Sequence, residues 1–209
     1  MSRYRTRSWR AFDPGAPRVP PASPAAPVAA AAAGLRILGL DPGSRRTGYG
    51  LIERRGADWV HVAHGCVTVT GQKQPLPQRL RVIFESLSEL IGAHAPAEIA
   101  IERVFVNRNV DSALKLGQAR GAALCAVPQG LPVFEYAPRA IKLALVGSGA
   151  AEKVQVAHMI RTLLGLQGHL SADAADALAV AVCHAHSRRL AELTARALVP
   201  GRAPEAAVR

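Results

Sequence analysis

Ile37-Leu38-Gly39-Leu40-Asp41 is a short apolar run that ends in an acid, and the turn residues Pro42-Gly43-Ser44 follow it. A short apolar run that stops at turn residues is typical of a buried strand. A second run of this kind, Ile99-Ala100-Ile101-Glu102, lies later in the chain and also ends in an acid. We therefore expect two buried strands, each with a carboxylate at its carboxyl end.

The residues around these two runs predict an α/β fold. The first run and two further strand candidates are joined by links so short that an antiparallel meander is favoured. Helices and strands then alternate, so the expected fold is a mixed five-stranded sheet, with three antiparallel strands plus two parallel ones, flanked by helices. The expected strands are Arg36–Asp41, Thr47–Glu53, Trp59–Thr70, Glu98–Val104 and Pro132–Tyr136. The expected helices are 77–92, Val110–Val127, Pro138–Val146, Ala151–Leu164 and Ala172–His186.

Four acids stand where they can meet. In this topology the first and fourth strands can lie side by side and parallel, which places Asp41 and Glu102 at one edge of the sheet. Asp173 and Asp176 are three residues apart in an Ala-rich helical stretch, so they share a helix face. Four converging carboxylates can hold two divalent cations, the usual arrangement for hydrolysing a phosphodiester.

Each acid also has an ordinary interpretation. Asp41 could cap the Asp-Pro-Gly turn, and Glu102 could be a charge at the edge of the sheet. Asp173 follows a possible helix N-cap, Ser171, where acids are favoured by the helix dipole. Asp176 is harder to explain in this way, because apolar residues flank it on a helix that should pack.

The charge of the chain is uneven. The 209 residues carry a net charge of +11, of which residues 1–34 hold +4 and residues 187–209 hold +3. Without the four acids, the remaining core stands at +8. A basic surface around an acidic centre suits a polyanionic substrate cut with metal ions, although a general preference for arginine over lysine would give the same net charge.

The cysteines and the apolar runs exclude several classes of protein. Cys66, Cys125 and Cys183 are odd in number and far apart, which argues against a disulfide framework and a structural zinc site and favours a reducing cytoplasm. No apolar run approaches the ~18 residues of a membrane span.

The ends of the chain differ from the middle. Residues 1–34 are expected to be a disordered leader rich in Arg, Pro and Ala, because they contain few large apolar side chains. A plain tail, a start codon assigned too early and a transit peptide remain open, although the prolines oppose the amphipathic helix of the last. We expect the folded domain at 35–187 and a basic, disordered tail at 188–209.

Several stretches make the chain similar to the RuvC family of Holliday-junction resolvases, within the ribonuclease H-like superfamily. They occur in the family's order, and the stretch from Asn109 to Gly121 is the most specific. The stretches are Gly39–Gly50, Ala100–Phe105, Asn109–Gly121, Pro132–Tyr136, Ala151–Val156 and Ala172–Ala179.

This resemblance assigns the chemistry. It implies that Asp41, Glu102, Asp173 and Asp176 are the catalytic acids and hold two Mg²⁺ ions per site, with Mn²⁺ able to substitute. Some members of the family have His at the position of Asp173, whereas this chain keeps the carboxylate. The implied reaction is hydrolysis in which one metal activates water and the other stabilises the leaving 3′ oxygen. It leaves a 5′-phosphate and a 3′-hydroxyl.

The resemblance also suggests the residues that contact DNA. Phe105 matches an aromatic that stacks on bases unpaired near the crossover, and its ordinary interpretation is a core aromatic at a strand end. Lys142 and Lys153 match basic positions that face the substrate near the metals, and otherwise they would be solvated helix residues. Weaker candidates for phosphate contacts are Arg108, Lys115 and Arg120.

The implied substrate is four-way junction DNA, cut during recombination and repair. Because a junction offers two equivalent strands, a C2 homodimer is expected, with Val110–Val127 as a candidate interface. The RuvA–RuvB branch-migration complex is a further implied partner.

Three other functions compete with this interpretation. An RNA-processing nuclease of ribonuclease H-like fold has the same acids. An actin-like ATPase shares the first Gly-x-Asp-x-Gly loop, but it needs a second phosphate loop and a second half of similar size, and this chain has neither. A nucleic-acid-binding protein without catalysis would be expected to lose a carboxylate of the site, and all four are present.

Overall fold

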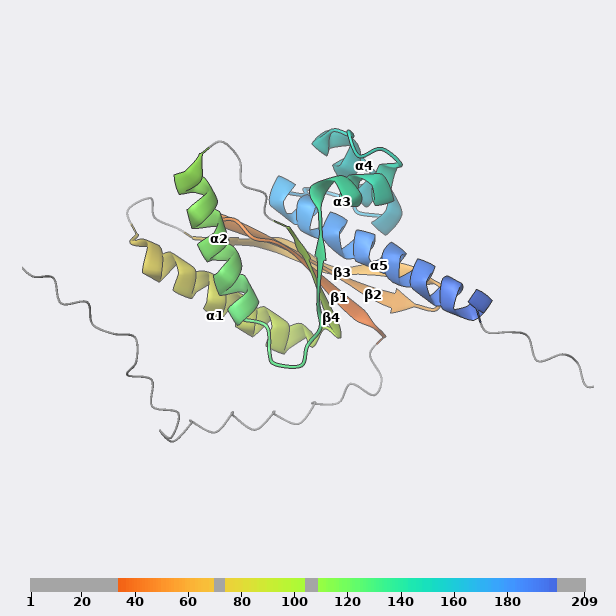
Figure 1. Cartoon of the computed structure of the whole chain (residues 1–209), viewed down its shortest axis with the longest axis horizontal. Helices are drawn as coiled ribbons and strands as arrows, with labels where there is room; N and C mark the ends of the chain where they lie inside the picture. The colour runs from red at the N-terminus through yellow and green to blue at the C-terminus, as the bar shows by residue number, and fades with distance from the viewer. Residues whose placement is uncertain (1–33, 70–73, 104–108, 199–209) are drawn as a thin grey trace, which may run out of the picture. The chain divides into compact units, whose positions relative to one another are not determined.

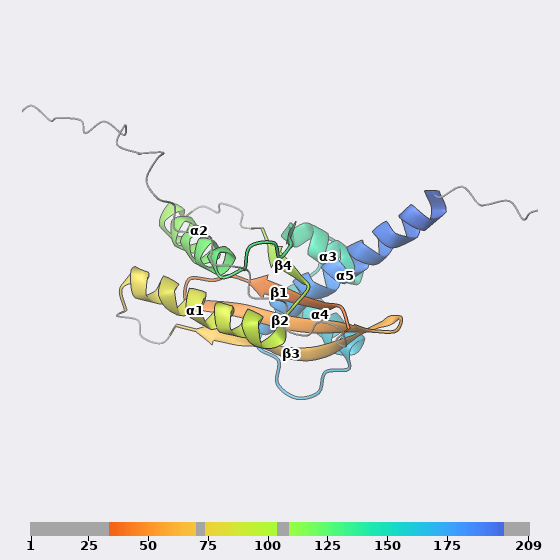
Figure 2. The same cartoon turned by 90° about the horizontal axis from the view of Figure 1, so that it is seen from below.

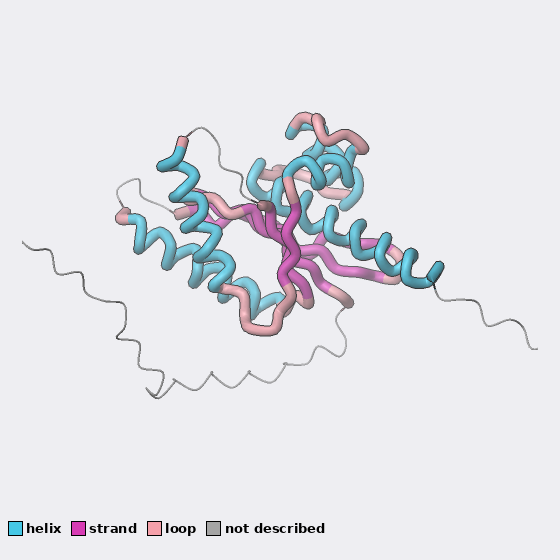
Figure 3. The backbone as a smooth tube through the Cα atoms, in the orientation of Figure 1, coloured by secondary structure: helices cyan, strands magenta, loops and turns pink. Residues whose placement is uncertain are grey.

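The computed structural model describes residues 34–69, 74–103 and 109–198. They form a five-stranded sheet in the order β3-β2-β1-β4-β5, with helices on both faces (Figures 1 and 3). The strands are β1 (Arg36–Asp41), β2 (Arg46–Arg55), β3 (Asp58–Thr68), β4 (Glu98–Glu102) and β5 (Val133–Tyr136). The helices are α1 (Leu76–His94), α2 (Val110–Cys125), α3 (Pro138–Val146), α4 (Lys153–Leu164) and α5 (Ala172–Leu198).

The strand pairing is the mixed arrangement that the sequence predicts. β1, β2 and β3 pair antiparallel, whereas β1 pairs parallel with β4 and β4 pairs parallel with β5. In the parallel pair, Leu40 lies opposite Ile101, so the residues that follow them, Asp41 and Glu102, end neighbouring strands at the same edge.

Side chains that alternate along the strands divide the core into two layers. Leu38 and Leu40 of β1 pack with α1 and α2, whereas Ile37 packs in the cluster formed by α3, α4 and α5. Ala100 of β4 also belongs to this second cluster. Figure 2 shows α1 on the side of the sheet opposite α3 and α5. By the same alternation, Asp41 and Glu102 are on the α5 face of the sheet.

Local signals account for most helix boundaries. α1 starts beside two prolines and ends at Ala95, which has a φ of 44° and precedes Pro96. Asn109 caps α2 by accepting a hydrogen bond from the backbone N of Ser112. Ser171 caps α5 in the predicted way, because its Oγ accepts from the backbone N of Ala174 at 3.4 Å.

One detail of the prediction was wrong. The basic tail expected from residue 188 is helical as far as Leu198, because Arg188 pairs with the buried Glu98 of β4 and so ties this part of α5 to the sheet. The ends Thr70 and Val104, predicted for two strands, lie outside the described residues.

Helix α5 lies unusually close to β1 and β2, and glycines make this possible. A Cβ atom added to Gly48 would lie 2.0 Å from the backbone O of Asp173. One added to Gly39 would lie 2.1 Å from the backbone O of Ala177. Any larger residue at these positions would push the first turns of α5 away from the sheet. No helix among the described residues is long and apolar enough to cross a membrane.

This contact makes Gly48→Ala a sharp test of how α5 is positioned. We expect the substitution to lower the free energy of unfolding by roughly 1–3 kcal/mol, because the added methyl group overlaps backbone that cannot move freely. Gly92→Ala in α1 is the control, because a Cβ there meets nothing within 4 Å and alanine favours helix by up to ~1 kcal/mol. Urea denaturation measures both. Equal stability of the Gly48 variant and the wild type would contradict the close approach.

Candidate active site

The four predicted acids come together at one edge of the sheet. Asp41 and Glu102 stand at the ends of the parallel pair β1 and β4, on the face that α5 covers. Asp173 and Asp176 lie in the first turns of α5, which Gly48 and Gly39 hold against this edge. All four side chains are partly exposed to solvent. The predicted convergence of two strand ends and a helical pair is therefore present.

Asp41 and Glu102 strongly influence each other's protonation. Burial, followed by the negative charge of Asp176, raises the pKa of Asp41 to about 6. Burial, followed by the charge of Asp41, raises the pKa of Glu102 to about 7. A hydrogen bond between the two side chains favours the proton on Glu102. This pair of carboxyl groups thus retains a proton near neutral pH, as expected of partly buried acids that lie close together.

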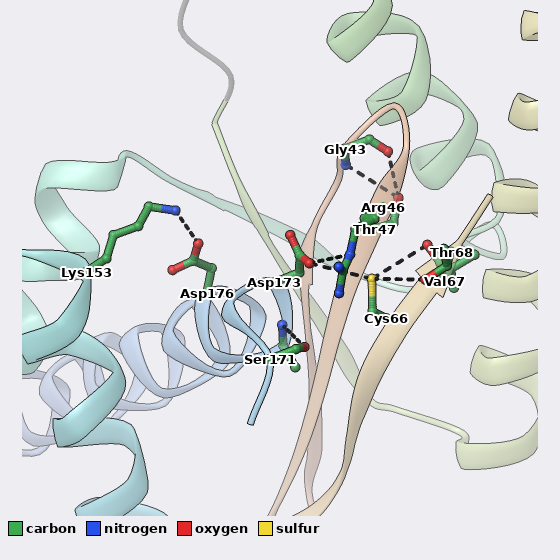
Figure 4. A network of polar contacts seen from close by, with 11 residues as sticks. Gly43, Arg46, Thr47, Cys66, Val67, Thr68, Lys153, Ser171, Asp173 and Asp176 are labelled. Atoms are coloured by element: carbon green, nitrogen blue, oxygen red, sulfur yellow. Dashed lines mark hydrogen bonds and ion pairs between the residues drawn. The ribbon is translucent and has the colours of Figure 1, made fainter. Parts of the chain in front are cut away.

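The two helical acids are each paired with a cation (Figure 4). Nζ of Lys153 lies 2.5 Å from Oδ2 of Asp176, and this hydrogen bond is the main reason why the pKa of Lys153 lies above its usual range. Nε of Arg46 lies 2.7 Å from Oδ2 of Asp173. Cys66 of β3 approaches the same oxygen, with Sγ at 3.8 Å.

A pocket opens beside these acids. Its volume is about 170 Å³, and Glu102, Asp176, Lys142 and Lys153 line it together with apolar residues. The apolar lining consists of Pro138, Ile141, Val156 and Ala179. The pocket therefore combines two of the predicted acids with both lysines that were predicted to face a substrate. Two acids and two lysines in one pocket can hold both a cation and an anion.

The acids have the right chemistry for a divalent cation. Carboxylate oxygens are the preferred ligands of Mg²⁺ and Mn²⁺. Among the described residues, however, no group of three His, Cys, Asp or Glu side chains is close enough to hold a metal ion as it stands. The pairing of Asp173 with Arg46 and of Asp176 with Lys153 accounts for part of this separation. The donor set fits a metal, provided that these carboxylates turn from their cationic partners.

The other predicted contact residues have different surroundings. Lys115 of α2 is 45% exposed and pairs with Asp111 at 2.5 Å. Arg120 is only 13% exposed, donates to the backbone O of Glu102, and pairs with Glu135 at 2.6 Å. Its guanidinium therefore fixes the end of β4 from inside the protein. Phe105 and Arg108 lie outside the described residues.

Sequence reasoning missed two residues next to the acids, Arg46 and Cys66. Arg46 lies within the Gly39–Gly50 stretch, only five positions after Asp41, but its pairing with Asp173 depends on how α5 folds back onto β2. Cys66 has no motif of its own and reaches the site only through the register of β3 with β2, where it lies opposite Gly48. In the strand pairing, Gly48 lies opposite Asp41 on one side and opposite Cys66 on the other, so only the register of the sheet could have placed these residues near the acids.

Comparison with known proteins agrees with this geometry. Residues 37–184 match the family model for the crossover junction endodeoxyribonuclease RuvC. The RuvC of Alkalilimnicola ehrlichii is 59% identical over 153 residues, which cover 72% of this chain and 91% of that protein. The RuvC of Methylococcus capsulatus is 56% identical over 155 residues, covering 74% and 92%.

Solved structures show the same fold. Thermus thermophilus RuvC in complex with a Holliday junction substrate superimposes with a TM-score of 0.70 at 34% identity, covering 75% of this chain and 96% of that one. The yeast mitochondrial Holliday junction resolvase Ydc2, at 14% identity and a TM-score of 0.56, supports the fold alone. The sheet and its flanking helices are thus of the ribonuclease H-like type, and the chain belongs to the RuvC family of crossover junction endodeoxyribonucleases.

Proposed function

We propose that this protein resolves four-way DNA junctions by paired, metal-dependent nicks during recombination and repair. The observation that carries the proposal is the meeting of Asp41 and Glu102, at the ends of neighbouring parallel strands, with Asp173 and Asp176 of α5. The relatives named for this activity, at 56–59% identity, support the same substrate. Paired cuts require two sites, and a C2 homodimer provides them.

Mg²⁺ is the cofactor that we propose, with two ions held by the four acids and Mn²⁺ able to replace it. When bound, the ions supply an activated water and stabilise the charge that develops on the leaving oxygen. The products would carry 5′-phosphate and 3′-hydroxyl ends. Asp41 and Glu102 would give up their shared proton to become ligands, and Asp173 and Asp176 would turn from their cationic partners.

The basic residues near the acids would hold the DNA backbone. Lys142 and Lys153 share the pocket with Glu102 and Asp176, so an ammonium group on a phosphate would place the scissile bond beside the carboxylates. Lys115, at 45% exposure, is available for a more distant phosphate. We propose a positioning role for Arg120 instead, because its guanidinium is directed inward to Glu102 and Glu135. Phe105 and Arg108 keep their proposed roles in base stacking and phosphate contact.

The partners and the compartment follow from the same activity. A junction-cutting enzyme acts where chromosomal DNA is processed, and the RuvA–RuvB complex is the partner that we propose for supplying junctions. The three free thiols, Cys66, Cys125 and Cys183, support a reducing cytoplasm.

Asp176→Asn tests the assignment of the acids. The amide keeps the shape of the side chain but removes the charge that a metal needs, so we expect nicking to fall by roughly 10²–10³-fold or more. Junction binding should persist because phosphate contacts come from basic residues elsewhere. The assay follows a labelled four-way junction with Mg²⁺ and maps nicks on all strands. Asp58→Asn, at the exposed first residue of β3, is the matched control and should cut at the wild-type rate. Near wild-type nicking by the Asp176 variant would show that the assignment is wrong.

The shared proton of Asp41 and Glu102 makes metal binding depend on pH. Below about pH 6 both carboxyls are protonated, and a metal must displace up to two protons to bind. We expect Mn²⁺ affinity to rise between pH 5.5 and 7 and to level off above pH 7, with a slope of up to about tenfold per pH unit for each proton released. Calorimetry in buffers of different ionisation enthalpy counts these protons. A constant affinity from pH 5.5 to 8 would contradict the shared proton.

The same groups set the stability of the protein without metal. The folded pKa values of about 6 and about 7 lie above the ordinary values of 3.8 and 4.5, so the folded state binds more protons than the unfolded state between about pH 4 and 7. The free energy of unfolding in a chelator should therefore fall as pH rises through this window. Asp41→Asn should weaken this dependence.

The homodimer proposal is tested on α2. Val110 and Leu114 are 66% and 63% exposed, and they lie four residues apart on one helix face. A charge within a buried apolar interface is strongly unfavourable, so Leu114→Glu should shift the protein to monomer at micromolar concentration. Leu190→Glu on α5 is the control, because Leu190 is 67% exposed on a different helix. Sedimentation velocity distinguishes the species, and a Leu114 variant that remains dimeric would exclude this face.

A further inference from the structure

Arg46 is a cation beside the active site with no role in the proposed chemistry. It is the first residue of β2 and follows the turn after Asp41. Its Nε lies 2.7 Å from Oδ2 of Asp173, and the two side chains are 51% and 31% exposed (Figure 4). The pair is therefore well formed and open to solvent.

The fold fixes where Arg46 stands. Thr47 is fully buried, and its Oγ1 donates to the backbone O of Gly43 at 3.2 Å, which closes the turn that carries Arg46. Two residues further along β2, Gly48 is close to the backbone of Asp173. Both ends of the ion pair are thus attached to rigid backbone, and the contact follows from how α5 packs on β2.

A guanidinium at this position competes with a metal ion for Asp173. Oδ2 of Asp173 already accepts from Nε of Arg46, and the thiol of Cys66 makes a weak contact with it at 3.8 Å, so a metal that binds this oxygen must displace the guanidinium. A positive charge beside a cation site also weakens binding by repulsion. Before a metal binds, the same charge relieves the repulsion among the four acids. Both effects favour the metal-free state, so Arg46 would stabilise the metal-free protein and lower its affinity for metal.

We propose that Arg46 is a positioning residue that acts as the exchangeable counter-ion of Asp173, balancing this carboxylate until a divalent cation displaces it. The inference rests on the proposed metal-dependent function and adds a control of metal affinity to it. Lys153 pairs with Asp176 in the same way but also lines the pocket where a phosphate would bind. Arg46 does not line that pocket.

The test is Mn²⁺ binding by the full-length protein, measured by calorimetry at pH 8. Arg46→Gln keeps hydrogen-bonding capacity but removes the charge, and we expect it to tighten binding at the Asp173 site about two- to fivefold. Arg46→Lys keeps the charge and should give a smaller gain. Arg45→Gln removes the same charge one residue away at an exposed position and should bind as the wild type does. Unchanged or weaker binding by the Arg46→Gln variant would overturn the proposal.

A double-mutant cycle with Asp173→Asn separates direct competition from a general effect of charge. The Mn²⁺ site that uses Asp173 as a ligand is identified as the site whose Mn²⁺ affinity falls in the Asp173→Asn variant. Arg46→Gln should not tighten Mn²⁺ binding further in the Asp173→Asn background, and an equal gain in affinity there would refute the pairing as the cause.

Melting in a chelator gives an independent readout, in which Arg46→Gln should lower the melting temperature more than Arg45→Gln. If wild-type protein binds no Mn²⁺, the proposed function fails. If the wild type binds and Arg46→Gln changes nothing, only this inference fails.

Discussion

The close packing of α5 on β1 and β2 is the constraint on which the site depends. Gly39 and Gly48 leave no side chain between the helix and the sheet, so the backbone of α5 lies where a Cβ atom would otherwise be. The helix residues that face the sheet in this region are mostly alanines, among them Ala174 and Ala177, which are fully buried. Small residues on both surfaces bring Asp173 and Asp176 to the strand ends that carry Asp41 and Glu102. Larger side chains would give an equally apolar interface, but they would move Asp173 and Asp176 away from Asp41 and Glu102.

Much of this arrangement could be predicted from the sequence, because it follows from local patterns. The run Ile37–Asp41 predicts a strand with the correct bounds, and the short links predict the antiparallel meander. The pairing of β1 with β4 follows once the order of elements is known. What could not be predicted depends on contacts between distant segments. The helical state of residues 188–198 is an example, because Arg188 pairs with Glu98, ninety positions away. The inward direction of Arg120 is another, because it depends on where β5 places Glu135.

Charge neutralisation explains why the site is stable before it binds metal. Four carboxylates at one edge repel one another, and two ion pairs and one retained proton reduce this repulsion. Arg46 pairs with Asp173, Lys153 pairs with Asp176, and Asp41 and Glu102 retain a proton between them. Both ion pairs are partly exposed and can therefore separate, and the proton dissociates near neutral pH.

The two ends of β4 each carry an acid, and the two acids have different partners. Glu98 starts the strand and is buried, but His184 donates to it at 2.8 Å and Arg188 pairs with its other oxygen. Because a carboxylate only accepts, Nε2 of His184 is the donor, and its Nδ1 pairs with the hydroxyl of Tyr136 at 2.6 Å. These side chains pair with one another and so hold α5 to β4 and β5, although among the described residues the buried Nε of Arg188 has no hydrogen-bond partner. Glu102 ends the same strand with another acid, Asp41, as its neighbour, and burial, followed by the charge of Asp41, raises its pKa to about 7. The satisfied end of β4 anchors the helix, and the unsatisfied end is where a metal ion would gain the most from binding.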